Sequence, residues 1–197
     1  MNNLSKGLIG MGCVLCATLV MAADNPDSAF FNKAAEGGIA EVELGKLAQE
    51  KSSNSSVKDY GAMMVRDHSA ANDKLKSLAE TKGIKLPTSP SVMQMGTKAR
   101  LELLSGDTFD KSYIKGMVKD HQDDIKEFQK EAANGQDSDG RAFATATLPT
   151  LQRHLKKIQA IAAQPMPQKI STMLESFRAM LTSQRPMTKN ANTKMTP

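Results

Sequence analysis

Apolar residues recur at a spacing of three or four along most of this chain, which is the period of an α-helix. Polar or glycine-containing breaks divide the pattern into four long segments, each with one apolar stripe. Four amphipathic segments of similar length predict an all-α fold, a ferritin-like four-helix bundle whose stripes face one core. The predicted helices cover residues 28–51, 57–82, 109–134 and 138–163.

The connection between the second and third helices, residues 84–107, loses this long period. A helix of about 26 residues is close to 40 Å long, and a connection of about two dozen residues can cover that distance. The second and third helices are therefore expected to run parallel, as in bundles with a long crossover. Lys98–Leu104 is predicted to form a short helix there. Gly37, Gly38 and Gly45 predict a close neighbour for the first helix.

One nine-residue pattern occurs twice, with the form Y-x3-M-V-[RK]-D-H. It runs from Tyr60 to His68 and again from Tyr113 to His121. Residues i, i+4 and i+8 share one face of a helix, so each copy places its tyrosine, methionine and histidine in one inward row. The two tyrosines are predicted to support the ligands from a second layer.

Helix lengths bring further polar groups to the level of these rows. His154 lies in the core stripe of the fourth helix, and Glu36 and Glu43 flank the middle of the first. In one interpretation this centre binds a transition metal, because buried polar groups are costly unless they are paired or bound. The candidate ligands are His68, His121, His154, Glu36, Glu43, Met64, Met117, Asp67 and Asp120.

The sequence leaves two questions open: which metal would bind, and whether the histidines bind a metal at all. Imidazole with thioether favours copper, whereas imidazole with carboxylate favours iron, zinc or manganese. In the alternative, the histidines are structural: they are neutral, hydrogen-bonded to protein groups, and fix the packing of the helices.

Catalytic motifs are not evident in the sequence. The Glu-x-x-His pairs of di-iron bundles are missing, since Val65, Val118 and Leu151 stand three positions before the histidines. There is no nucleophile elbow, phosphate loop or zinc-protease motif. The sequence therefore favours a non-catalytic binding protein. The second hypothesis is an envelope interaction or stress protein with purely structural histidines, and a metal-dependent oxidase using Tyr60 or Tyr113 is the third.

The N-terminal segment has the anatomy of a secretory signal peptide. Lys6 precedes an apolar run, and Val20-Met-Ala22 fits cleavage after residue 22. This predicts export, with a periplasmic location and possible association with the outer membrane. The alternative to simple cleavage is an N-terminus that is lipidated on Cys13 or Cys16. Both cysteines of the chain lie in this segment, so a cleaved chain has no thiolate site. The predicted bundle domain is 23–163.

The net charge of +5 arises outside the predicted bundle. Lys6 and the basic tail hold the excess, and residues 23–163 contain equal numbers of basic and acidic side chains. A neutral domain argues against nucleic-acid binding, which usually needs a basic face.

The tail, 164–197, is rich in methionine and basic residues. A short amphipathic helix is predicted there, either docked on the bundle or used to contact an envelope protein or a membrane surface. Capture of soft metal ions by methionines spaced seven apart is a further alternative. The contact residues would be Ile170, Met173, Phe177, Met180, Lys169 and Arg178.

Several motifs together resemble a known bacterial family of exported proteins, the domain of unknown function numbered 4142. They include Met64-Val-Arg-Asp-His68, Met117-Val-Lys-Asp-His121 and Leu148-Pro-x-Leu-x-x-His154-Leu. The likeness covers about residues 27–163. It implies a fold similar to ferritin-like bundles and a periplasmic or outer-membrane location, and it implies no established activity.

Overall fold

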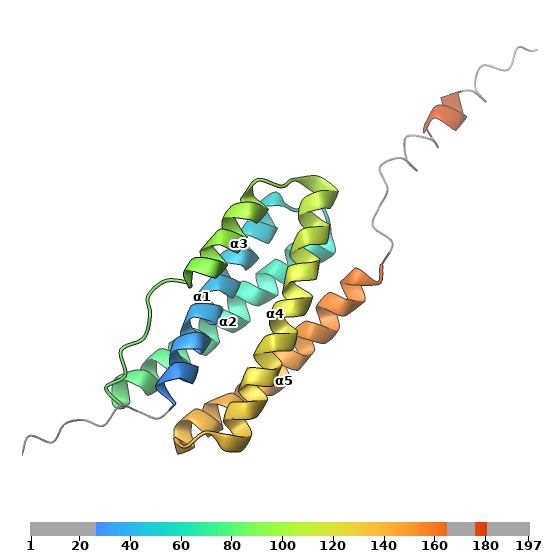
Figure 1. The fold of residues 1–197 in the computed structure, drawn as a ribbon. Coiled ribbons are helices and arrows are strands. Elements are labelled where there is room, and N and C mark those ends of the chain that lie inside the picture. The colour runs from blue at the N-terminus through green and yellow to red at the C-terminus, as the bar shows by residue number, and fades with distance from the viewer. Residues whose placement is uncertain (1–26, 165–175, 181–197) are drawn as a thin grey trace, which may run out of the picture.

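The computed structural model describes residues 27–164 and 176–180, and the predicted signal peptide lies outside them. The first of these two ranges is helical over most of its length (Figure 1). None of the helices in the described residues is long and apolar enough to cross a membrane. The helices are α1 (Ser28–Lys51), α2 (Ser55–Thr81), α3 (Val92–Glu102), α4 (Gly106–Asn134) and α5 (Ser138–Ala162).

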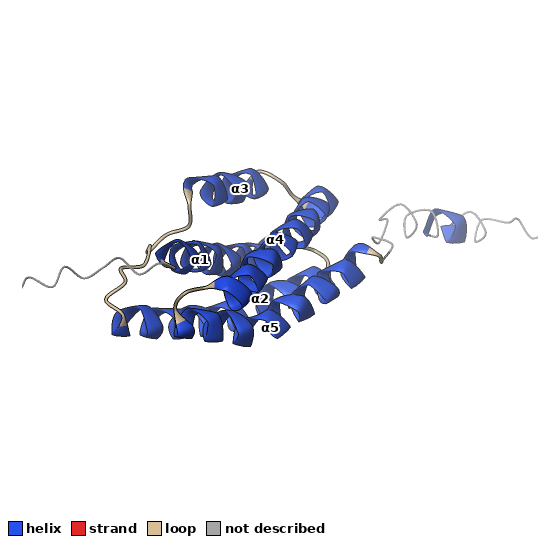
Figure 2. Ribbon diagram, turned by 60° about the horizontal axis from the view of Figure 1, so that its bottom comes forward, coloured by secondary structure: helices blue, strands red, loops and turns tan. Residues whose placement is uncertain are grey.

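The helices pack as two antiparallel pairs, α1 with α2 and α4 with α5. Contacts of α2 with α5 and of α1 with α4 join the pairs into one bundle. Figure 1 shows α2 and α4 running in the same direction, joined by the segment that contains α3. Figure 2 shows α3 on the outer side of α1 and α4. The predicted all-α bundle and the long crossover are both confirmed.

The helix within the crossover is longer than predicted and begins earlier, at Val92 rather than Lys98. Ser91 explains the early start. Its hydroxyl accepts from the backbone N–H of Gln94, and the Gln94 side chain accepts from the backbone N–H of Ser91 at 2.8 Å. This reciprocal capping box satisfies two N–H groups at the start of the helix.

Two hydrophobic clusters fill the bundle, one toward each end. One contains Tyr60, Met64, Tyr113, Met117 and Ile158, among others. The other is built around Phe30, Phe31, Leu75, Phe128 and Leu151. Along α2, α4 and α5 a histidine separates the residues of one cluster from those of the other.

Close approach of α1 and α2 depends on a pair of glycines. A Cβ atom on Gly45 would lie 2.6 Å from the Gly61 carbonyl oxygen, and a Cβ on Gly61 would lie equally close to the Gly45 oxygen. Such distances are below van der Waals contact, so both positions require glycine. Gly38 is similarly enclosed by Asn72, whereas a Cβ on Gly37 would meet only Gln94 at an ordinary 3.9 Å.

Candidate metal centre

Three histidines from three helices meet in the middle of the bundle. His68 comes from α2, His121 from α4 and His154 from α5, and all three are buried. One nitrogen of each imidazole lies within 4.8 Å of the others. The ring centroids are 5.3–5.8 Å apart. The helical period thus brings all three predicted imidazoles to one point.

The protein fixes the tautomer of His121. Its Nδ1 lies 3.0 Å from the carbonyl oxygen of Met117, one turn earlier on α4. Since a carbonyl oxygen only accepts hydrogen bonds, Nδ1 carries the proton. In the neutral ring, Nε2 therefore presents a lone pair toward the centre.

Asp67 fixes the tautomer of His154. The His154 Nε2–H group donates to Asp67 Oδ2 at 2.9 Å. Burial opposes ionisation of Asp67, but hydrogen bonds from His154, Arg66 and Arg153 outweigh it and lower the pKa of Asp67 to about 2. Asp67 is thus an acceptor at neutral pH, and His154 Nδ1 presents a lone pair inward.

The two lone-pair nitrogens, His121 Nε2 and His154 Nδ1, are only 3.3 Å apart. A hydrogen bond between them would require an additional proton and hence a buried imidazolium. Burial, reinforced by the neighbouring His154, lowers the pKa of His121 to about 4, and burial also lowers the pKa of His154. At neutral pH two acceptors therefore face each other.

This separation is the one that a tetrahedral metal site requires. With metal–nitrogen bonds of about 2.0–2.1 Å, two ligand atoms of a tetrahedron lie about 3.3–3.4 Å apart. The outer hydrogen bonds of both rings, to a backbone carbonyl and to a carboxylate, are those that usually orient metal-binding histidines.

The third ring is available for binding as well. His68 Nε2 is buried and has no hydrogen-bond partner. Burial, followed by the proximity of His121 and His154, lowers the pKa of His68 to about 3, so this ring is neutral too. A buried imidazole nitrogen without a partner is costly, which favours a ligand for it.

The predicted carboxylates do not join the imidazoles. Among the described residues, the set of ligand atoms within 4.8 Å of one another comprises the three histidines alone. Asp67 orients His154 from the outer side. Glu43 pairs with Lys98 of α3 at 3.1 Å, and Glu36 and Asp120 line a neighbouring cavity.

Met64 and Met117 belong to the hydrophobic cluster next to the histidines, where both side chains are buried. Tyr60 and Tyr113 lie in the same cluster, with ring centroids 6.3 Å apart. The ring of Tyr60 lies edge-on to His121 at 6.3 Å. Burial raises the pKa of both tyrosines, so their hydroxyls stay protonated.

Glu41 is a buried carboxyl group that the helical stripe did not predict. Its Oε1 lies 3.8 Å from Nδ1 of His121, the nitrogen that faces away from the other imidazoles. Burial raises the pKa of Glu41 strongly, and the charges of Asp124 and Asp120 raise it further. Glu41 is therefore a buried carboxyl group behind His121 whose pKa lies well above its usual range. Its signal in the sequence was its spacing of three from both Gly38 and Leu44.

The sequence family is now clear. The domain of unknown function DUF4142 matches residues 17–161, most of the chain. The chain belongs to the DUF4142 family. The resemblance seen in the sequence motifs is thereby confirmed, and the three histidines of this DUF4142 domain all fall within the matched residues. No protein with a curated description matches the chain.

A solved structure with a similar fold is that of a conserved hypothetical protein, rv2844, from Mycobacterium tuberculosis. The TM-score is 0.56 at 16% sequence identity, and the match covers 72% of the DUF4142 chain and 94% of the other. At this identity the likeness concerns the fold alone.

The predicted contact residues of the tail are described only in part. Residues 176–180 are helical, and Phe177, Arg178 and Met180 are exposed. Ile170, Met173 and Lys169 lie outside the described residues.

Proposed function

We propose that this protein binds one transition-metal ion through His68, His121 and His154, in a ferritin-like bundle exported to the bacterial envelope. The observation that carries the proposal is the 3.3 Å separation of His121 Nε2 and His154 Nδ1, two nitrogens whose tautomers leave lone pairs on both. The sequence pattern of a signal peptide supports export to the periplasm.

The donor set restricts the metal. Three neutral imidazoles suit zinc, copper, iron or nickel, and their number leaves one tetrahedral position for water or a small ligand. Glu41 lies 3.8 Å from the outer nitrogen of His121 and is not one of the three candidate ligands. The site needs no catalytic group to act in this way, so we infer a binding protein.

Calorimetric titration of the metal-free protein tests the proposal. Zn(II), Co(II), Cu(II), Fe(II) and Cu(I) are each added, and one equivalent of at least one ion is expected to bind. The double variant His121→Ala/His154→Ala should lose this binding, whereas Glu43→Gln, which alters a predicted ligand paired with Lys98, should retain it. Absence of saturable binding, or binding that the double variant retains, would refute the proposal.

A second candidate function is partner or membrane-surface contact through the tail. Phe177 and Met180 are about 64% and 62% exposed and lie three positions apart in the helical residues 176–180, so they form an apolar pair open to a partner. In this alternative the histidines serve only to order the core. Deletion of residues 165–197 tests it, because unchanged localisation and unchanged co-purifying partners would argue against a role for the tail.

A further inference from the structure

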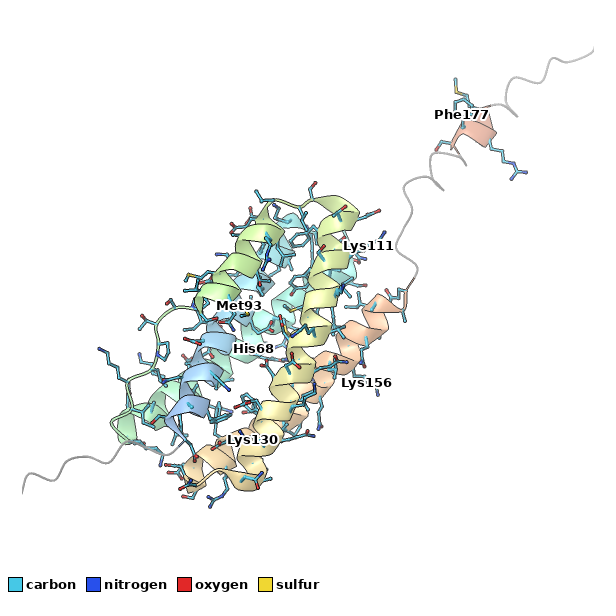
Figure 3. The ribbon with its side chains drawn as sticks, in the orientation of Figure 1. His68, Met93, Lys111, Lys130, Lys156 and Phe177 are labelled. Carbon is cyan, nitrogen blue, oxygen red and sulfur yellow. The ribbon has the colours of Figure 1, made fainter. Side chains whose placement is uncertain are left out.

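A cavity of about 370 Å³ lies beside the metal centre. All four long helices and the start of α3 contribute to its lining, which includes His68. Figure 3 labels His68 in the middle of the bundle and Met93 on α3. Met93 also lines the cavity and is about 79% exposed, so the cavity extends from the solvent-facing side of α3 toward the buried histidine.

The cavity is acidic. Two of its carboxylates are neutralised by lysines: Glu127 pairs with Lys33 at 3.3 Å, and Asp123 pairs with Lys119 at 2.6 Å. Three more, Glu36, Asp120 and Asp124, have no cation within ion-pair distance among the described residues. These three are half-buried. Burial raises the pKa of Asp120, and it raises the pKa of Asp124 to about 7, so the negative charge of Asp124 is complete only above neutral pH. Bulk solvent then screens these charges less than it screens surface charges.

His68 is the link between the cavity and the metal centre. The His68 side chain lines the cavity and belongs to the three-histidine group. Its buried Nε2 has no hydrogen-bond partner. The other two imidazoles are held by Met117 and Asp67 on their outer sides. An incoming ion would therefore meet first the carboxylates and then an unpartnered imidazole.

We propose that this cavity is the path by which a hydrated divalent cation reaches the histidines, with Glu36, Asp120 and Asp124 attracting it on the way. The proposal rests on the proposed function of the histidines. A metal site inside a folded domain needs a path for the ion. A cleft lined by charges of one sign concentrates counter-ions and accelerates their binding about 10- to 1000-fold.

The charge of the lining also selects the form in which the metal arrives. A free aqua cation is attracted, whereas a metal delivered as an anionic chelate is repelled by the same carboxylates. The volume is sufficient for an ion with part of its hydration shell, because one water occupies about 30 Å³ in the liquid.

The test uses stopped-flow absorption to measure the rate at which metal-free protein takes up Co(II), at pH 8, where Asp124 with its pKa of about 7 is mostly ionised. The variant Glu36→Gln/Asp124→Asn removes two cavity charges while leaving Asp120, the neighbour of His121, in place. The matched control Glu50→Gln/Asp59→Asn removes two charges from exposed positions outside the cavity lining. Circular dichroism verifies that both variants are folded.

We expect the cavity variant to bind one Co(II) with the wild-type spectrum, but to load about tenfold more slowly at low salt. The deficit should shrink in high salt, where the Debye length is only about 3 Å at 1 M. The control should load at the wild-type rate. If the cavity variant takes up Co(II) at the wild-type rate, or if both variants are slowed equally, the proposed entry path is overturned while the metal site stands. If the wild type binds neither Co(II) nor any other ion of the titration, the metal site itself is overturned.

Discussion

His121 Nε2 and His154 Nδ1 face each other at 3.3 Å in the middle of the bundle, each as the lone-pair nitrogen of a neutral ring. Two acceptors in this position repel each other, and a shared cation removes the repulsion. The contact costs stability in the metal-free protein and becomes favourable when an ion binds. Through this contact, metal binding is expected to stabilise the folded protein.

His68→Leu should separate the metal-binding and structural interpretations. His68 Nε2 is buried without a partner, and leucine has a similar volume with no polar atom. We expect the metal-free variant to be more stable than the wild type by about 1–2 kcal/mol, since an unsatisfied buried group is removed. Metal affinity should fall at least about 100-fold. Chemical denaturation and calorimetry measure the two quantities, and lower stability of the metal-free variant would support a structural histidine.

Asp67→Ala should weaken metal binding without removing a ligand. The carboxylate accepts from His154 Nε2–H at 2.9 Å and so fixes the ring orientation. Loss of such an outer partner typically lowers metal affinity about 10- to 100-fold. Arg153→Gln is the matched control, because it removes the 3.1 Å ion pair to Asp67 but leaves the His154 bond. Equal losses of affinity in the two variants would contradict this role of Asp67.

Gly45→Ala should destabilise the bundle at the contact between α1 and α2. The new Cβ would lie 2.6 Å from the Gly61 carbonyl oxygen, so the backbones must separate. Overpacking of this kind costs about 1–3 kcal/mol. Gly116→Ala is the control, because nothing lies within 4 Å of its Cβ position and alanine favours a helix by up to about 1 kcal/mol. Thermal unfolding should shift in opposite directions for the two variants.

The stability of the fold should depend on pH through Glu131. Burial, reinforced by the charge of Asp27, raises the pKa of Glu131 from 4.5 to about 7. A carboxyl group with a raised native pKa destabilises the fold as pH rises from the unfolded value through the native one. Its penalty is absent below pH 4.5 and complete above pH 7.

Glu131→Gln removes that penalty. The variant should therefore gain stability relative to the wild type between pH 5 and pH 8, by up to about 3 kcal/mol because each pH unit is worth about 1.4 kcal/mol. Urea denaturation at the two pH values measures the difference. Glu50→Gln, which changes an exposed carboxylate, serves as the control. If the change in unfolding free energy between the two pH values is the same for Glu131→Gln as for the wild type, this account is contradicted.

The sequence was sufficient to predict the helices, the crossover and the level of the histidines. The spacing of the apolar residues determines which face of a helix is buried. The position of a residue within a helix of known length determines how far along the bundle it lies. These two quantities placed His68, His121 and His154 together without knowledge of the packing. The repeated Tyr-Met-His pattern further predicted that α2 and α4 present equivalent sets of side chains to the core.

The carboxylates could not be placed in the same way. Asp67 is turned by about 100° from His68, so its partner depends on α5 being the neighbour of α2. Glu43 pairs with Lys98 because α3 packs on the outside of α1, which no helical period specifies. Glu41 is buried because α1 contacts both α2 and α4, so the buried face of α1 is wider than one helical stripe.

The most direct measurement of the central claim is zinc K-edge X-ray absorption on protein loaded with one equivalent of Zn(II). We predict three imidazole nitrogens at about 2.0 Å and one further light ligand, as expected for a tetrahedral three-histidine site. His68→Leu should lose one imidazole from the spectrum, or lose zinc altogether. A spectrum with oxygen ligands alone, or three imidazoles that persist in His68→Leu, would contradict the account.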